Sequence, residues 1–324
     1  MNRRGLLVAG AMAGLARPAL GADWRPSQPL RVLVAAAPGG TLDIHARAAQ
    51  GPLSAVLGQT VIVENQGGGA GRVAALQMGR AVPDGHNMLV ASGDGLVLQD
   101  ILAGARHGKA RTNLRAVTMT ISAAQLLVTH PRSGITDVQG YFAALRARGD
   151  RVTLAVPGIG GIAHIISEMV NRELGVNVTH VPYRGGGPAT LDLLAGQVDA
   201  MIITLPAVTT HVREGRLVPL AVSTRERDPA MPNVPSYSET VAPGFDVPST
   251  QGVLVPAGTP DAAVAALEEA WRTALTDAVV RERLQALGFV IRATTSAAFE
   301  ANLASSETRF AQVIAAAGIR GDDG

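Results

Sequence analysis

Cysteine is absent from the 324 residues of this chain. Disulfide bonds, thiolate zinc sites, cysteine nucleophiles and a lipid anchor on an N-terminal cysteine are therefore excluded. Aromatic residues are scarce at 3%, so the core has to be built from Ala, Val, Leu and Ile. After the N-terminal region, no segment keeps the run of about 20 apolar residues that a membrane-spanning helix needs. Hydrophobic residues make up 47% and charged residues 17%, a balance that favours a folded protein over disorder.

The N-terminal region has the three parts of a secretory signal peptide. Asn2 to Gly5 is basic, Leu6 to Ala16 is an apolar run, and Ala19 to Ala22 supplies small residues for cleavage. We expect residues 1–22 to be removed and the mature chain to be periplasmic. The paired arginines of the basic part leave both the general and the twin-arginine export routes open. A buried N-terminal helix is the alternative.

The charge of the mature chain argues against a nucleic-acid partner. The whole chain has a formal net charge of +2. Removal of residues 1–22 takes away three arginines, so 25 basic residues of the original 28 remain against 26 acidic ones, and the net charge becomes −1. A chain this close to neutral lacks the basic surface on which nucleic-acid binding depends.

Apolar strand patterns and helical patterns alternate along the chain. Strands are predicted at residues 30–36, 61–64, 88–92, 115–122, 126–129, 152–156, 178–181, 200–203, 217–223 and 252–255. Helices are predicted at residues 42–56, 69–80, 141–148, 162–174, 188–195, 260–276, 278–287 and 297–317, with Thr259 as an N-cap of the helix that follows it. This alternation predicts mostly parallel sheets with helices on both faces.

The segment 229–248 is rich in Pro and Ser and is predicted to be a linker. The helix-rich segment after it has too few strands for a third domain and is better suited to completing the first lobe. We therefore predict an α/β protein of two lobes, with residues 23–123 and 248–324 in lobe 1 and residues 124–247 in lobe 2. Two crossings between lobes make a hinge.

Two glycine-rich loops, one in each predicted lobe, follow a strand and open a helix. The first runs from Ala37 to Asp43 and the second from Val156 to His164. Each places glycine backbone at a helix N-terminus, where free N–H groups and the positive end of the helix dipole favour an anion. The pair can grip both ends of a dicarboxylate, or a larger acid. The alternative is that the glycines only permit tight turns.

The second loop also has a spacing loosely like that of a dinucleotide-binding loop, which expects an acidic residue about 20 residues later. The next strand, residues 178–181, reads Val-Thr-His-Val and has no acid, so this alternative fails. Asp43 would repel a carboxylate, so we expect it to bond loop amides or to favour the helix dipole. His164 is either a ligand contact or a satisfied, half-buried residue.

No catalytic or metal-binding motif is present. The sequence has no HExxH pair, no GxSxG elbow and no P-loop. The seven histidines are scattered, although His164 stands four residues before Glu168. We expect no metal, no cofactor and no catalytic residue. An enzyme that uses His164 or Asp43 as a base stays open as an alternative.

Many segments, in one order, resemble the solute-binding proteins of tripartite tricarboxylate transporters, also called the Bug or TctC family. They include Pro29–Asp43, Leu57–Asn65, Gly69–Gly71, Pro83–His86, His180–Ala189, Asp192–Asp199, Val255–Pro260 and Ala315–Ile319. The resemblance extends from about Arg25 to Ile319, nearly the whole mature chain.

The resemblance implies a two-lobed periplasmic-binding-protein fold, a venus flytrap of type II, with a carboxylate in the cleft between the lobes. The implied partners are the small carboxylate and the membrane transporter subunits, and a monomer is expected. The ligand-binding residues that follow are Pro38, Gly39, Gly40, Thr41, Asp43, Ser92 and Gly93 in lobe 1 and Gly158, Gly160, Gly161, Ile162, His164 and Thr204 in lobe 2.

This chain departs from the family pattern at positions expected to face the cleft. The family often has an aromatic residue at Ala36 or Ala37, Phe-Asp-Asn at Ile202–Thr204, and an aromatic pair at Thr250 and Gln251. Loss of these side chains is expected to widen the pocket and to remove stacking surface. The expected function is capture of a small carboxylate-bearing solute for a secondary transporter. The alternatives are an enzyme on the same scaffold and a ligand sensor for a signalling partner.

Overall fold

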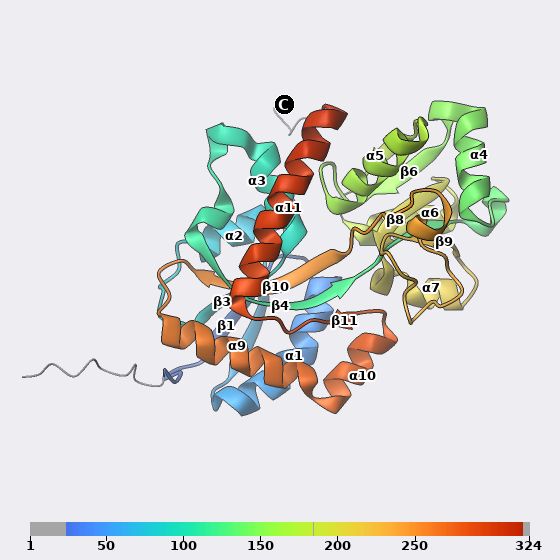
Figure 1. Ribbon diagram of the computed structural model, residues 1–324. Coiled ribbons are helices and arrows are strands. Elements are labelled where there is room, and N and C mark those ends of the chain that lie inside the picture. The colour runs from blue at the N-terminus through green and yellow to red at the C-terminus, as the bar shows by residue number, and fades with distance from the viewer. Residues whose placement is uncertain (1–23, 184, 320–324) are drawn as a thin grey trace, which may run out of the picture.

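The structure is a computed structural model, and it describes residues 24–183 and 185–319. The strands form two sheets, each with its own helices, and the two units lie side by side (Figure 1). We call the unit around the six-stranded sheet lobe 1 and the unit around the five-stranded sheet lobe 2. The expected signal peptide, residues 1–22, lies outside the described residues. No helix in the described part of the chain is long and apolar enough to cross a membrane.

The sheet of lobe 1 has the strand order β11-β4-β10-β3-β1-β2. Its strands are β1 (Leu30–Val34), β2 (Val61–Asn65), β3 (Asn87–Ser92), β4 (Leu114–Ala123), β10 (Ser249–Pro256) and β11 (Val290–Ile291). Strand β1 is parallel to β2 and β3. Strand β10 is antiparallel to β3 and β4, and β11 is antiparallel to β4.

The sheet of lobe 2 has the strand order β7-β6-β8-β5-β9. Its strands are β5 (Gln125–Thr129), β6 (Thr153–Val156), β7 (Thr179–Pro182), β8 (Ala200–Thr204) and β9 (Val218–Val222). Strand β6 is parallel to β7 and β8, whereas β5 is antiparallel to β8 and β9.

The prediction of mostly parallel sheets is wrong, because β5 and β10 are antiparallel to the strands on both sides of them. Parallel pairing needs a crossover helix between consecutive strands. Strand β4 instead leaves lobe 1 at Ala123 and continues directly into β5 at Gln125. Strand β10 returns from lobe 2 in the opposite direction. The antiparallel strands are therefore those that carry the chain between the lobes.

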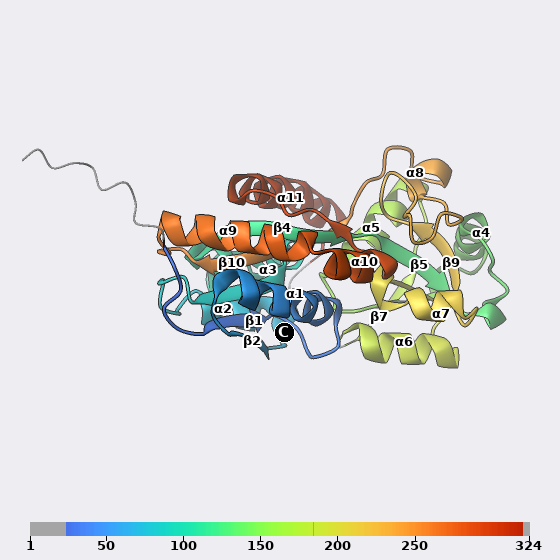
Figure 2. The same ribbon diagram turned by 90° about the horizontal axis from the view of Figure 1, so that it is seen from below.

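Helices cover both faces of the lobe 1 sheet (Figure 2). They are α1 (Thr41–Leu57), α2 (Arg72–Met78), α3 (Gly93–His107), α9 (Asp261–Thr276), α10 (Ala278–Ala286) and α11 (Ser296–Ala317). Helix α1 packs against α9 and α10, and α3 packs against α2 and α11. The contacts thus group the helices into one layer on each side of the sheet.

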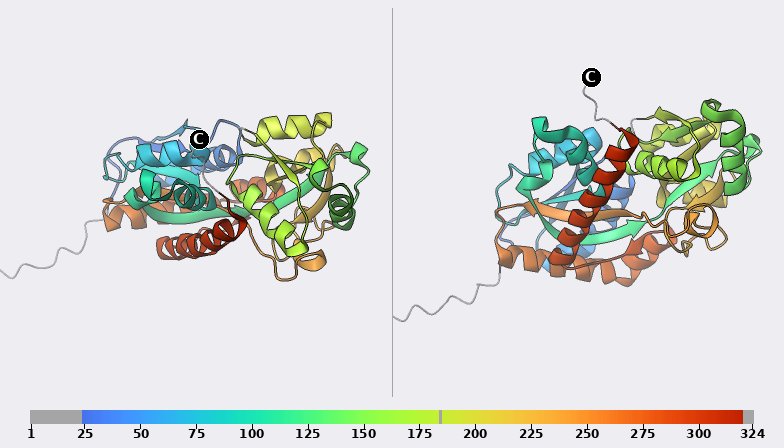
Figure 3. Two further views of the ribbon diagram at one scale, coloured as in Figure 1. Left: turned by 90° about the horizontal axis from the view of Figure 1, so that it is seen from above. Right: turned by 45° about the horizontal axis from the view of Figure 1, so that its top comes forward.

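Lobe 2 has fewer and shorter helices. They are α4 (Val138–Arg148), α5 (Ile162–Leu174), α6 (Gly186–Ala195), α7 (Thr209–Arg213) and α8 (Tyr237–Thr240). In the described part of both lobes, short 3-10 turns lie at Gly69–Gly71, Ala110–Asn113, Pro131–Ser133, Gly149–Arg151 and Leu205–Ala207. Helix α11 extends from lobe 1 to a contact with α5 of lobe 2 (Figure 3).

Aliphatic residues make up most of the core, as the composition predicts, and most of the few large aromatic side chains lie within it. Trp271, Phe299 and Phe310 are all fully buried in lobe 1. Trp271 packs on β3, where its indole N–H lies 3.3 Å from the sulfur of Met88. Three buried rings on α9 and α11 therefore attach these late helices to the first lobe.

Helix α3 is an element that the sequence pattern did not predict. Its start, Gly93-Asp94-Gly95, and the glycine at position 104 weaken the helical signal because glycine is a poor helix former. The side chain of Ser92 caps the helix and accepts a hydrogen bond from Gly95 N. The cap and the packing on α11 outweigh the low helix propensity of these glycines.

Two further expectations are corrected by the structure. Thr259 is not the N-cap of α9: that position is Pro260, and the buried Thr259 hydroxyl has no hydrogen-bond partner among the described residues. The predicted linker 229–248 contains the short helix α8. Ser236 and Glu239 form a capping box at its start, and Tyr237 is buried, so this part of the segment packs on lobe 2.

Candidate ligand-binding cleft

A cavity of about 580 Å³ lies between the lobes. Lobe 1 contributes Ala36, Gly39, Gly40, Thr41, Leu42 and Ile44 to its lining. Lobe 2 contributes Gln125, Pro157, Gly158, Gly161, Ile162, Ala163, Gly186, Gly187, Thr190, Leu191, Ile203, Thr204, Pro206, Ala207 and His211. The volume is within the usual range for small-molecule sites.

The two glycine-rich loops contain the same kind of hydrogen-bonded turn. In lobe 1, Gly40 N donates to Ala37 O at 3.4 Å, and in lobe 2, Gly161 N donates to Gly158 O at 3.3 Å. The third residue of each turn is a glycine at positive φ, +80° at Gly39 and +70° at Gly160. Glycine is favoured at this position of such a turn because most other residues are strained there.

Both turns lead into helices whose first N–H groups have no side-chain cap. Gly40 and Gly161 are the N-cap residues of α1 and α5, with nearly the same extended conformation, φ −74° and −77° and ψ 168°. Helix α6 likewise starts without a side-chain cap, after Gly185. Three uncapped helix N-termini, one from lobe 1 and two from lobe 2, thus line one cavity. Their N–H groups and dipoles favour an anion there.

Asp43 lies behind the first loop. Its Oδ2 accepts a hydrogen bond from Gly39 N at 2.9 Å, and its Oδ1 accepts from Arg47 Nε at 2.8 Å and from Asn65 Nδ2 at 2.9 Å. Burial raises the pKa of Asp43, but the hydrogen bonds from Gly39, Arg47 and Asn65 lower it below its ordinary value overall. The expectation that Asp43 bonds a loop amide is confirmed.

His164 has the corresponding position in lobe 2, since both residues are the third of their helix. Its Nδ1 accepts a hydrogen bond from Gly160 N at 3.0 Å. Burial lowers the pKa of His164, which favours the neutral ring that can accept this bond. The two loops are thus held by the same kind of contact, from a carboxylate in one lobe and an imidazole in the other.

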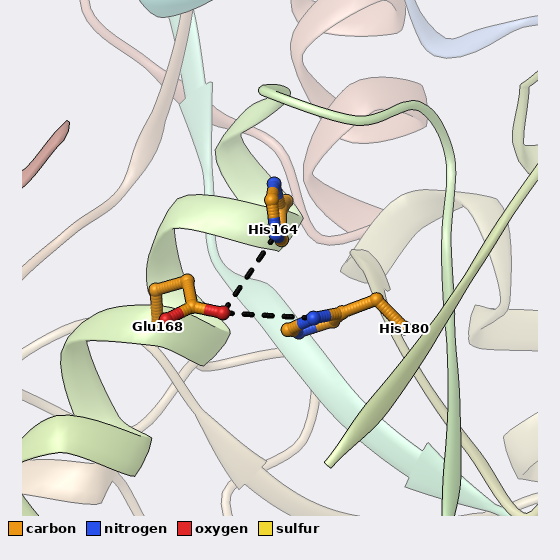
Figure 4. Close-up of side chains that lie close together, drawn as sticks. All are labelled: His164, Glu168 and His180. Carbon is orange, nitrogen blue, oxygen red and sulfur yellow. Dashed lines mark ion pairs between the residues drawn. The ribbon is translucent and has the colours of Figure 1, made fainter. Parts of the chain in front are cut away.

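His164 belongs to a cluster with Glu168 and His180, which brings α5 and β7 together (Figure 4). The Oε1 atom of Glu168 lies 3.8 Å from His164 Nε2 and 3.6 Å from His180 Nδ1. The two rings meet edge to face with centroids 4.5 Å apart. Burial lowers the pKa of His180 to about 4, with a smaller contribution in the same direction from the neighbouring His164. Burial raises the pKa of Glu168.

The cluster has the spacing of a metal site, because its three ligand atoms lie within 4.8 Å of one another. Its hydrogen bonds favour a different interpretation. His164 Nδ1 accepts from Gly160, so in the neutral ring the proton is on Nε2 and faces Glu168. A metal ligand would need a lone pair on that nitrogen. The cluster is best described as a hydrogen-bonded support for the second loop. That no metal is bound stays a prediction.

Seven predicted site residues line the cavity: Gly39, Gly40, Thr41, Gly158, Gly161, Ile162 and Thr204. The other six do not. Pro38 is exposed on the first loop, and Asp43, Gly160 and His164 support the loops from behind. Ser92 caps α3, and Gly93 packs against Thr250 and Phe299.

Several lining residues were not predicted. Gly186 and Gly187 open α6, and the run of glycines at 185–187 carries the same signal as the two predicted loops. Gln125 and His211 had no local signal, because they reach the cavity through the pairing of β5 with β8 and the position of α7. His211 is the single titratable side chain among the described lining residues. Apolar side chains such as Leu42, Ile162 and Ile203 make up much of the rest.

Comparison with known proteins identifies the chain. The profile of the tripartite tricarboxylate transporter family receptor matches residues 45–319. The chain belongs to this family. The receptor is 32% identical to protein BugT of Bordetella pertussis over 279 residues, which is 86% of this chain and 85% of that protein. The predicted family is therefore confirmed, and it is a family of solute-binding receptors rather than of enzymes.

Solved structures show the same fold. The receptor matches MatC of Rhodopseudomonas palustris with bound malate at 29% identity and a TM-score of 0.82, covering 89% of this chain and 99% of that one. It matches R. palustris Rpa4515 with adipate at 26% identity and a TM-score of 0.86, covering 92% and 100%. The predicted two-lobed α/β binding-protein fold is confirmed.

Proposed function

We propose that this receptor is a periplasmic solute-binding protein that captures a carboxylate-bearing solute between its lobes for a tripartite tricarboxylate-type transporter. The observation that carries the proposal is the set of three uncapped helix N-termini around one cavity. They supply N–H donors and positive dipole ends for an anion. No Asp or Glu side chain is among the described lining residues to oppose it.

The similar structures support a carboxylate, since one contains malate and the other adipate. Binding without chemistry is supported by the lining itself. His211 is its single titratable side chain, and no nucleophile with a neighbouring base is found among the described lining residues. We propose a monomer, with lobe 1 made of residues 23–123 and 248–324, lobe 2 made of residues 124–247, and residues 1–22 removed on export.

Ligand binding is best tested by thermal shift of the mature chain with adipate, malate and a wider set of carboxylic acids. A ligand that binds the folded state raises Tm, by an amount equivalent to about 2.7 kcal/mol at 100 times Kd. Uncharged amides of the same acids serve as controls and should have no effect. If no carboxylate raised Tm, or if the amides did so equally, the carboxylate proposal would be wrong.

The two loops are tested by adding side chains at their helix N-caps. Gly40 and Gly161 have negative φ, so a valine there is tolerated by the backbone and acts by crowding the N–H groups. Gly40→Val and Gly161→Val should weaken carboxylate binding without loss of fold by circular dichroism. Gly51→Ala, also in α1 and with no atom beyond its chain neighbours close to the new methyl group, is the control. Unchanged affinity in both loop variants would remove the loops from the site.

Closure and the absence of chemistry need separate measurements. An anion that contacts helix N-termini of both lobes stabilises the closed arrangement. Small-angle scattering should give a smaller radius of gyration with saturating carboxylate than without it. Mass spectrometry should recover the carboxylate unaltered after long incubation. A chemically changed product would favour the enzyme, and tight binding without compaction would reject closure.

A further inference from the structure

A buried glutamine contacts a cleft threonine in each lobe. In lobe 1, Gln251 Nε2 donates to Thr41 Oγ1 at 3.1 Å. In lobe 2, Gln125 Nε2 donates to Thr204 Oγ1 at 2.9 Å. Gln251 is 4% exposed and Gln125 is 1% exposed. Both threonines line the cavity.

The two pairs arise from different parts of the fold. Gln125 and Thr204 are directly opposite each other in the antiparallel pairing of β5 with β8. Gln251 is on β10, opposite Ser92 of β3, and reaches the first residue of α1. The same contact is therefore built twice, from unrelated elements, at the two sides of one cleft.

The direction of these bonds determines what each hydroxyl can do. A threonine hydroxyl has one proton and two lone pairs. An amide N–H from glutamine occupies one lone pair, which leaves the proton to be donated elsewhere. Within the described part of the chain, no acceptor receives the proton of Thr41 or of Thr204. Both protons are thus available to a molecule in the cleft.

Gln251 also acts on a buried histidine, His45. Gln251 Oε1 and both ring nitrogens of His45 are buried without a hydrogen-bond partner of normal geometry in the described chain. The dominant effect on the pKa of His45 is burial, which lowers it, but Gln251 raises it by hydrogen bonding. Because Gln251 Nε2 donates to Thr41, the amide oxygen is the atom of Gln251 that is left for His45.

We propose that Gln251 and Gln125 are positioning residues that commit the hydroxyls of Thr41 and Thr204 to donate into the cleft. The receptor then selects a solute that offers a hydrogen-bond acceptor, such as a carboxylate oxygen, to each lobe. This inference rests on the proposed function for its ligand. The hydrogen-bond direction itself can be tested without any ligand.

The binding test is a double-mutant cycle measured by calorimetry with adipate and malate as probes. Thr41→Val keeps the shape but removes the hydroxyl and should weaken binding about tenfold, the usual effect of one hydrogen bond to a charged group. Gln251→Leu should weaken it about threefold, because the hydroxyl is no longer held as a donor. The double variant should bind within about twofold of Thr41→Val alone.

A merely structural role of Gln251 would give effects that multiply, and that result would overturn the proposal, as would unchanged affinity in Gln251→Leu. The same cycle applies to Gln125→Leu and Thr204→Val. Gln50→Leu removes an amide that bonds Val61 O in lobe 1 away from the cleft and should leave affinity unchanged. Circular dichroism and Tm confirm that each variant is folded.

Neutron diffraction from ligand-free crystals locates the deuterons directly. The proposal expects amide deuterons of Gln251 and Gln125 directed at the threonine oxygens, and hydroxyl deuterons directed into the cleft. Amides of the opposite orientation would overturn it even if carboxylates bind. If the deuterons are as expected but neither acid binds the wild-type protein, selection of a carboxylate and the proposed function fail together, while the hydrogen-bond direction stands.

Discussion

Replacement of His45 should flatten the dependence of stability on pH. His45 is on α1, has no exposed surface and lies 5.7 Å from the ring of Trp271. Burial lowers its pKa from 6.5 to about 4, although Gln251 acts in the opposite direction. The folded protein therefore keeps a neutral ring over a pH range in which the unfolded chain binds a proton.

The sign and size of the effect follow from this difference. Above pH 7 the ring is neutral in both states, so the contribution of His45 to the pH dependence is negligible. As pH falls through 6.5 the unfolded chain takes up a proton that the folded state accepts only near pH 4. The free energy of unfolding thus falls with falling pH. Between pH 7 and pH 5, His45 lowers it by about 2 kcal/mol.

The assay is urea unfolding of the mature wild-type protein and of His45→Leu at pH 7 and pH 5. From pH 7 to pH 5, the free energy of unfolding of the variant should fall by about 2 kcal/mol less than that of the wild type. Other groups titrate in both proteins and cancel in the comparison, including His180, whose pKa is also about 4. The absolute stability of the variant is free to differ. Equal losses in the two proteins would show that His45 is protonated normally in the folded state.

Three further outcomes are expected. Gly160→Ala should weaken carboxylate binding about tenfold. The φ angle of Gly160 is +70°, so alanine there adds about 1–2 kcal/mol of strain, which favours a displaced loop. Wild-type affinity by calorimetry would disprove this. His164→Phe, which removes the acceptor for Gly160 N, should also weaken binding, whereas an unchanged Kd would leave the histidine without a role in the loop. Gly252→Ala should lower the free energy of unfolding by more than about 2 kcal/mol, since the new methyl group would overlap the Phe299 ring. Gly51→Ala, whose new methyl group meets no atom beyond the adjacent residues of the chain, should instead change stability by less than about 1 kcal/mol. Similar urea midpoints for these two variants would contradict the packing argument.

The sequence alone was enough to predict the two glycine-rich loops and the two-lobed α/β fold. Both loops show a strand, a pair of glycines and a helical pattern in adjacent residues, so their local signals coincide. Asp43 is four residues from Gly39, and its hydrogen bond to that residue is therefore a local property. The length and alternation of the elements likewise made two α/β lobes the natural expectation.

The tertiary structure decided what lies opposite those loops. Gln125 reaches Thr204 across a pair of strands, and Gln251 reaches Thr41 from a strand 210 residues later in the chain. His180 joins His164 from a neighbouring strand. None of these contacts has a sequence pattern, because the spacing along the chain carries no information about distance once sheet pairing brings remote strands together. The polar groups that complete the cleft are therefore properties of the folded chain, whereas the backbone donors within its loops could be predicted from neighbouring residues.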